Sequence, residues 1–294
     1  MKKVIFIGGS SYSGTTMLDM ILSNDPEGFS CGEIHALFYP YRKHHKKPTC
    51  GCGDSNCMIW ENIKKQGVKN CYRAIFQLFP QITFIIDSSK NPLWIKYQMK
   101  QLQQQNISYK NILIWKHPLD IAASHYKRNQ IDKWEQSWKN YHHLYFHLIQ
   151  SFELIAYKDI IQSKMSLKKV CDILGIPFFE DKSRYWEKTQ HTLFGNRTAK
   201  IHLWNQESSV FLNTHKQLES DHTEKYHNFK SIYYNNVLPQ NLQDQIKLRC
   251  QNEKELSYLL KILEKKSCYS KKYTIKTLSI KFKQIFKWYF RRLI

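Results

Sequence analysis

The chain alternates short apolar runs with segments of helical periodicity, and most of the apolar runs end in a polar motif. Val4–Ile7 is a β-branched apolar run closed by Gly8 and Gly9, and apolar residues recur at helical spacing across Thr15–Leu22. Strands that alternate with helices are joined by right-handed crossovers within a mainly parallel sheet. The sequence therefore predicts an α/β fold with a central, mainly parallel sheet flanked by helices.

The same spacing predicts three further strand–helix units. The expected strands are Ile82–Ile86, Ile112–Trp115 and Leu154–Tyr157. The expected helices are Leu93–Leu102, Leu119–Lys127 and Ile160–Leu174, the last ending at Gly175. Open α/β sheets bind ligands at the carboxyl ends of their strands, so the polar motifs that follow these strands are the candidate site residues.

The turn after the first strand has the glycine spacing of a phosphate-binding loop. Gly9 and Gly14 stand five residues apart, and in such loops backbone N–H groups and a helix N-terminus converge on an anion. Thr15 stands where the nucleotide-hydrolysing version has lysine, which disfavours ordinary triphosphate binding. Taken alone, the loop is equally compatible with a glycine turn whose hydroxyls cap the next helix.

Several motifs in order resemble one enzyme family. Ser13-Gly14-Thr15-Thr16, followed by Cys31-Gly32-Glu33, resembles the sulfotransferases that use 3′-phosphoadenosine-5′-phosphosulfate, most closely the bacterial members. The further matches are Asp87–Pro92, Lys116-x-Pro118 with Ser124, Tyr157–Asp159 and Gly195–Arg197. The resemblance spans roughly Val4 to Asn196. It implies a P-loop-like sulfotransferase fold and an enzyme that moves a sulfuryl group from that donor to a hydroxyl or amine of a small-molecule or carbohydrate acceptor.

The resemblance also implies which residues bind the donor. The loop residues expected to hold the 5′-phosphosulfate are Ser10, Ser11, Tyr12, Ser13, Gly14, Thr15 and Thr16. Lys116 and Ser124 match the residues that hold the 3′-phosphate, and Arg197 is the candidate second basic contact, with Lys200 as its alternate. Lys116 replaces an arginine of the family, so the bidentate fork is lost. No metal is required.

Two residues carry the expected chemistry. Glu33 matches the family's catalytic base, and we expect an apolar pocket to raise its pKa. Lys90 matches the lysine that neutralises charge on the leaving oxygen, and it is expected to replace the cation that the family usually has at the position of Tyr12. The plainer alternatives are a surface glutamate and a solvated lysine. Asp87 is expected to cap the turn that follows it.

A group of cysteines follows Glu33. Cys50, Cys52 and Cys57 resemble a cysteine cluster of the bacterial family members. A fourth ligand from Cys31, Cys71, His44 or His45 would complete a zinc site, although the paired C-x-x-C spacing is lacking. A structural thiol cluster without metal is an equally good interpretation. The segments Glu33–Trp60 and Lys127–His147 are expected to border the acceptor mouth.

The charge is concentrated at the C-terminus. The formal net charge is +21, and residues 265–294 hold ten basic and no acidic residues, which leaves +11 for residues 1–264. We predict a catalytic domain over 1–264 and a basic amphipathic tail over 265–294. The tail residues Phe282, Ile285, Phe286, Tyr289 and Leu293 share one helical face, which suits peripheral membrane contact or packing on the body.

Signals for export or membrane insertion bear on the location of the protein, and two rival functions stay open. Only four apolar residues follow Met1–Lys3, and no run is long enough to span a bilayer, which predicts a cytoplasmic protein with reduced thiols. One rival function is a P-loop-type nucleotide kinase or NTPase variant. The other is a non-enzymatic basic protein that binds nucleic acid or membrane. The ordered phosphate motifs argue against nucleic acid as a partner of residues 1–264.

Overall fold

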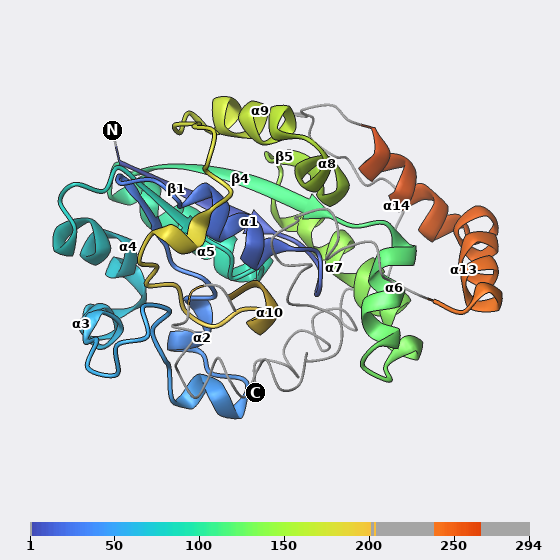
Figure 1. The fold of residues 1–294 in the computed structure, drawn as a ribbon, viewed down its shortest axis with the longest axis horizontal. Helices are drawn as coiled ribbons and strands as arrows, with labels where there is room; N and C mark the ends of the chain where they lie inside the picture. Colours follow the sequence, from blue (N-terminus) through green and yellow to red (C-terminus); the bar gives the residue numbers. More distant parts are fainter. Residues whose placement is uncertain (1, 201–202, 204–237, 266–294) are drawn as a thin grey trace.

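Five strands form one parallel sheet in the order β2-β3-β1-β4-β5 (Figure 1). The computed structural model describes residues 2–200, 203 and 238–265, apart from the side chains of Arg197 and Thr198. The strands are β1 (Lys3–Gly8), β2 (Gly28–Ser30), β3 (Phe84–Asp87), β4 (Ser108–Trp115) and β5 (Glu153–Ala156). Every strand pairing is parallel. The predicted α/β fold with a parallel sheet flanked by helices is confirmed.

Helices connect the strands and follow the last one. The α-helices are α1 (Thr15–Leu22), α2 (His35–Phe38), α3 (Ile59–Lys65), α4 (Gly67–Leu78), α5 (Pro92–Gln104), α6 (Pro118–Tyr126), α7 (Trp134–Leu148), α8 (Tyr157–Gln162), α9 (Lys164–Leu174), α10 (Arg197–Lys200), α13 (Gln240–Asn252) and α14 (Lys254–Glu264). The described residues also form the short 3-10 helices η1 (Lys43–Lys46), η2 (Ile131–Lys133) and η3 (Tyr185–Glu187).

The alternation of side chains along β1 separates two apolar layers. Val4 and Phe6 face one side of the sheet and join the core formed with α3, α4, α5 and α7. Ile5 and Ile7 face the other side and join the core formed with α1, α8 and α9. Both faces are therefore covered, which is why β1 is apolar at every position from Val4 to Ile7.

The bounds of all four predicted strands differ from the observed ones, and two strands begin two or more residues away from the predicted start. The run from Ile82 begins its strand only at Phe84, and the run from Ile112 is the buried half of a strand that begins at Ser108. Ser108 joins the sheet because its Cα pairs with that of Lys3 at the start of β1. The edge strand β2 was not predicted, since its three residues are too few for a periodic signal.

The helix predicted from Ile160 to Leu174 is wrong as a single element. It is two helices, α8 and α9, separated at Ser163, whose backbone is extended with φ −146°. The Ser163 hydroxyl accepts a hydrogen bond from the Ser166 N–H at 3.4 Å and so begins α9. Gly175 ends α9 in the left-handed conformation, as predicted.

The last described helices pack at one end of the molecule. Figure 1 shows α13 and α14 beside α6 and α7, far from α3 and α4. Leu256, Leu259, Leu260 and Leu263 are the buried residues of α14. None of the helices within the described ranges has the length and apolar character that crossing a bilayer demands. The predicted tail lies outside the described residues, apart from Lys265.

Candidate active site

The polar motifs meet at one edge of the sheet because the strands are all parallel. Each strand delivers a motif at its carboxyl end, and these are Gly9–Thr16 after β1, Gly32–Glu33 after β2, Ser88–Lys90 after β3, Lys116 after β4 and Tyr157 after β5. These are the positions where open α/β sheets bind their ligands.

The loop after β1 is a tight turn held by its own serines. The Ser13 N–H donates to the Ser10 carbonyl at 3.2 Å, and the Ser13 hydroxyl donates to the same carbonyl. Tyr12 and Gly14 have left-handed φ angles of 70° and 93°. Turns that mix left-handed and right-handed residues gather backbone N–H groups into an anion-binding concavity.

Gly14 starts helix α1 with no side-chain cap. A Cβ at this position would lie 2.3 Å from Cε2 of Tyr157, so any larger residue would collide with the ring. The N–H groups of a first helical turn lack partners within the helix and suit an anion. Thr15 and Thr16 are buried here, and the Thr16 hydroxyl accepts a hydrogen bond from the Asn196 N–H at 3.1 Å.

Glu33 and Lys90 form an ion pair across the edge between β2 and β3. The Lys90 ammonium contacts Oε1 of Glu33, and the Tyr41 hydroxyl donates to Oε2 at 3.3 Å. Glu33 is 7% exposed. The structure therefore brings the two predicted catalytic residues together, in a partly water-excluded place where charge interactions are strong.

The expectation that the pKa of Glu33 is raised is wrong for this structure. Burial acts in the raising direction, but the ammonium of Lys90, assisted by Arg42, outweighs it and lowers the pKa of Glu33. The prediction considered the apolar surroundings and omitted the cation. Glu33 is therefore ionised at neutral pH, which is the form that a proton acceptor needs.

Backbone contacts with a late segment fix the position of Glu33. The Glu33 N–H donates to the Leu193 carbonyl at 2.9 Å, and the Leu193 N–H donates to the Cys31 carbonyl at 3.3 Å. Gly32 has φ 59°, and a Cβ there would lie 1.9 Å from the Leu193 carbonyl oxygen. Only glycine allows this approach, so Gly32 serves the placement of the neighbouring carboxylate.

Tyr141 on α7 joins two of the motifs and was not among the predicted site residues. Its hydroxyl accepts a hydrogen bond from the Gly9 N–H at 2.7 Å and donates to the Lys90 carbonyl at 2.8 Å. Lys90 has a left-handed φ of 63°, an uncommon backbone conformation for a residue with a side chain. Tyr141 thereby holds the start of the loop and the turn of Lys90 in a fixed relation.

A basic group surrounds the end of β4. Lys116 is buried with its ammonium 3.8 Å from the centre of the Tyr157 ring. Burial lowers the pKa of Lys116 to about 8, and the positive charges of Arg128 and Lys127 add to the effect, while Asp120 opposes it. A bound anion would offset the repulsion among these positive charges and so stabilise the charged form of Lys116.

Arg128 is a second basic residue near Lys116, and it was not among the predicted site residues. Its guanidinium lies 4.3 Å from the centre of the Tyr12 ring, and its Nη1 donates to the Ser124 carbonyl at 2.6 Å. The Tyr12 and His125 rings meet in a T-shaped arrangement, with ring centres 5.0 Å apart. A cation from a different element therefore stands beside Tyr12 of the loop. No motif around residue 128 signals this.

The remaining donor-site candidates are placed as follows. The Ser124 hydroxyl lies in the last turn of α6 and donates to the Asp120 carbonyl at 3.0 Å. Arg197 begins α10, and its side chain lies outside the described residues. Its alternate, Lys200, is buried and donates to the Thr192 carbonyl at 3.4 Å. Burial lowers the pKa of Lys200 to about 8, against the attraction of Glu33 and Asp19.

Asp87 caps the turn that follows it, as predicted. Its Oδ1 accepts a hydrogen bond from the Ser89 N–H at 2.7 Å. Its Oδ2 accepts from the Tyr72 hydroxyl and from Trp94 Nε1 at 2.9 Å. Both carboxylate oxygens are therefore engaged within the protein.

Asp19 on α1 is a further buried acid, and its raised pKa makes the stability of the protein depend on pH. Its Oδ2 accepts a hydrogen bond from the Ser88 hydroxyl at 2.6 Å, and burial raises its pKa to about 7. Because the folded protein binds this proton more tightly than the unfolded chain, the contribution of Asp19 to stability is greatest at low pH. That contribution falls as the pH rises from about 4 to about 7.

Asp19→Asn should therefore be more stable than the original protein at pH 8, by a few kcal/mol at most. The gain should shrink steadily as the pH falls toward 4, which denaturant unfolding at several pH values would measure. The exposed Asp172→Asn on α9 is the control and should change the free energy of unfolding by less than about 0.5 kcal/mol. A gain from Asp19→Asn that does not vary with pH would contradict the assignment.

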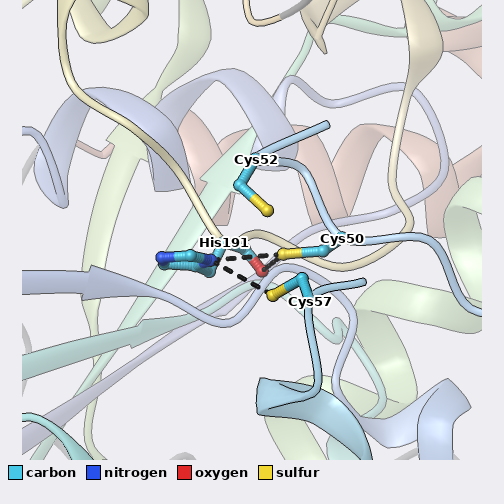
Figure 2. A group of neighbouring side chains, drawn as sticks. All are labelled: Cys50, Cys52, Cys57 and His191. Carbon is cyan, nitrogen blue, oxygen red and sulfur yellow. Dashed lines mark hydrogen bonds between the residues drawn. The ribbon is translucent and has the colours of Figure 1, made fainter. Parts of the chain in front are cut away.

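Three of the cysteines gather with a histidine. The side-chain ligand atoms of Cys50, Cys52, Cys57 and His191 lie within 4.8 Å of one another (Figure 2). The predicted fourth partners are wrong. Cys31 and Cys71 are buried in the apolar core, and the rings of His44 and His45 pack on Phe194. The seven described cysteines form no disulfide.

Comparison with known proteins finds distant likeness in structure only. No model of a known family matches the chain, and no curated protein matches it. A sulfotransferase domain from the curacin biosynthetic pathway is 14% identical with a TM-score of 0.46, over 75% of this chain and 99% of that one. The sulfotransferase domain from the Synechococcus PCC 7002 olefin synthase is 16% identical with a TM-score of 0.43, over 81% and 96%.

A third solved structure, a sulfotransferase from Alicyclobacillus acidocaldarius, is 16% identical with a TM-score of 0.36, over 74% of this chain and 95% of that one. Because all three similarities are this distant, the role of the site is inferred below from the residues of this chain.

Proposed function

We propose that the chain is a sulfotransferase that moves the sulfuryl group of 3′-phosphoadenosine-5′-phosphosulfate to a hydroxyl or amine of a small-molecule or carbohydrate acceptor. The observation that carries the proposal is the partly buried ion pair of Glu33 and Lys90, at the same sheet edge as a loop that has the glycine spacing of a phosphate-binding loop but no triphosphate lysine. A base and a cation beside a phosphate site are the groups that sulfuryl transfer needs.

In the proposed reaction the acceptor oxygen or nitrogen attacks sulfur as the bond from sulfur to the 5′-phosphate oxygen breaks. The acceptor proton passes to the carboxylate of Glu33, and the electron pair of the broken bond stays on the phosphate, which leaves as part of adenosine 3′,5′-bisphosphate. As Glu33 takes the proton, the ammonium of Lys90 loses its counter-charge and turns to the leaving oxygen. One lysine thus serves both ends of the transfer.

The 3′-phosphate is assigned to the basic group at the end of β4. Lys116 and Ser124 are its proposed ligands, and Arg128 lies close enough to contribute charge beside Tyr12. The loop from Ser10 to Thr16 is the proposed 5′-phosphosulfate site. Both anions of the donor would then be bound at one edge of the sheet.

The kinase or NTPase alternative is less well supported. Such an enzyme needs a lysine at position 15 and an acid that faces Mg²⁺, and Asp87 is the acid at the corresponding strand end. Asp87 already accepts hydrogen bonds from Ser89, Tyr72 and Trp94, so both of its carboxylate oxygens are engaged within the protein.

Calorimetric titration of the full chain tests the proposal. Adenosine 3′,5′-bisphosphate should bind without added metal, and Lys116→Ala should weaken that binding by roughly 10- to 150-fold. Adenosine 5′-monophosphate, which lacks the 3′-phosphate, should lose far less. Because the pKa of Lys116 is about 8, affinity for the bisphosphate should fall between pH 7 and pH 9 in the original protein and not in the variant.

The matched control is Lys168→Ala, an exposed lysine paired with Asp172 on α9, which should bind both nucleotides normally. Equal losses for both nucleotides in Lys116→Ala would contradict the 3′-phosphate assignment. Binding of ATP only with added Mg²⁺, and no binding of the bisphosphate, would overturn the proposed function in favour of a kinase or NTPase.

A further inference from the structure

Four metal-binding side chains converge beside the proposed active site. Figure 2 shows the sulfurs of Cys50, Cys52 and Cys57 turned toward one another and toward the ring of His191. Nδ1 of His191 lies 3.3 Å from Sγ of Cys50 and 3.8 Å from Sγ of Cys57. The mechanism proposed above uses none of these ligand atoms.

The distances suit a tetrahedral zinc site. With Zn–S bonds of about 2.3 Å and a Zn–N bond of about 2.0 to 2.1 Å, a sulfur and a nitrogen on a tetrahedron lie about 3.5 to 3.6 Å apart and two sulfurs about 3.8 Å apart. The two measured nitrogen–sulfur separations bracket the expected one, and no ligand pair exceeds 4.8 Å. Small side-chain rotations would therefore complete the coordination.

The protein holds the histidine in place through its backbone and its ring. Trp60 Nε1 donates to the His191 carbonyl at 2.7 Å, and the Gly51 N–H donates to the Thr192 carbonyl at 2.9 Å. The imidazole stacks on Phe29, with ring centres 6.2 Å apart and planes 14° apart. A ring fixed in this way presents Nδ1 to the thiols without further ordering, which favours metal binding.

We propose that Cys50, Cys52, Cys57 and His191 form a structural zinc site. Three thiolates and one imidazole fill all four tetrahedral positions, so the site is closed and no position is left for substrate. Thiolate sulfur selects zinc over magnesium, calcium and manganese, which prefer oxygen. The two short connections within residues 50–57 let one loop supply three ligands.

The zinc site would also hold in place the segment that positions Glu33. It joins the loop of residues 50–57 to the segment that contains His191 and Leu193, and the Leu193 carbonyl accepts the hydrogen bond from the Glu33 N–H. Cys50 and Leu193 also form a backbone bridge, and Gly32 pairs with Leu193 from the other side. The metal would therefore act through Leu193 as a positioning element for Glu33, and would contact no reacting atom.

Elemental analysis of the full-length protein, purified under reducing conditions without chelator, tests the site directly. About one equivalent of zinc per chain is expected, and Cys52→Ser and His191→Ala should lose most of it. The control Cys250→Ser removes a cysteine outside the cluster and should keep the zinc. This measurement uses no substrate, so its result does not depend on whether the proposed sulfuryl transfer is correct.

If Cys52→Ser and His191→Ala fail to fold, cobalt substitution and the replacement of one ligand residue by another still test the site. Co²⁺ added to the zinc-depleted original protein should give the thiolate charge-transfer and tetrahedral d–d absorption bands of an S₃N site. His191→Cys offers four thiolates and should still bind zinc, with stronger charge-transfer absorption. Absence of both metals from the reduced original protein, a disulfide within the cluster, or equal zinc loss in Cys250→Ser would overturn the proposal.

Discussion

Glu33→Gln is expected to lower turnover by roughly two to four orders of magnitude while leaving donor affinity nearly unchanged. Glutamine keeps the shape of the side chain and an oxygen for Tyr41, but it cannot accept the acceptor proton. Steady-state rates with labelled phosphosulfate donor, screened over carbohydrates, phenols and amines, would measure the loss once an acceptor is found. Calorimetric binding of adenosine 3′,5′-bisphosphate would measure the affinity.

Tyr41→Phe is the matched control for Glu33. It removes only the 3.3 Å hydrogen bond to Oε2 and leaves the carboxylate and its pair with Lys90, so we expect a loss below about tenfold. Since the Lys90 ammonium lowers the pKa of Glu33, the original protein should show no fall in activity from this group above pH 5. If Glu33→Gln turns over within a few-fold of the original protein, Glu33 is not the base.

Lys90→Ala is expected to reduce turnover by on the order of 10²- to 10³-fold, because the charge that develops on the leaving oxygen loses its counter-ion. It should also raise the pKa of Glu33, since Lys90 is the strongest influence that lowers it and burial then acts unopposed. The acid limb of the rate profile should accordingly move to higher pH. A loss of fold alone would produce no such shift.

Two further variants are controls for Lys90→Ala. Lys90→Arg keeps a cation beside Glu33 and should restore part of the rate and the low acid limb. Tyr12→Phe keeps the ring that contacts Arg128 and His125 and should be mild, since Tyr12 supplies no charge. A mild Lys90→Ala together with a severe Tyr12→Phe would mean that the loop, through Arg128, supplies the cation instead.

The convergence of the donor motifs could be predicted, whereas their contacts with distant segments could not. Most of the motifs follow an apolar run that the sequence shows clearly, as Val4–Ile7 does before Gly9, and parallel strands bring such ends together wherever they fall in the sequence. Tyr141 joins Gly9 to Lys90 from α7, yet in the sequence it is one aromatic residue in a helix with many.

The pKa of Glu33 shows why a charge state cannot be predicted from a motif. The motif indicates a carboxylate in an apolar place, and that description favours a raised pKa. The sign is decided by a lysine 57 residues further along the chain, in contact with the carboxylate. Coulomb energy depends on the distance between atoms, and sequence separation does not give that distance.

The sequence by itself determined four of the five strands of the sheet and the helices that begin after them, because hydrophobic periodicity and glycine turns act within a few residues of one another. It therefore predicted the α/β class, the loop at Gly9–Thr16 and the capping role of Asp87. Tertiary structure alone decided which side chains meet. His191 lies beside Cys50 although 141 residues separate them, because the chain returns past Glu33 to close the site, and packing of the whole sheet fixes that return.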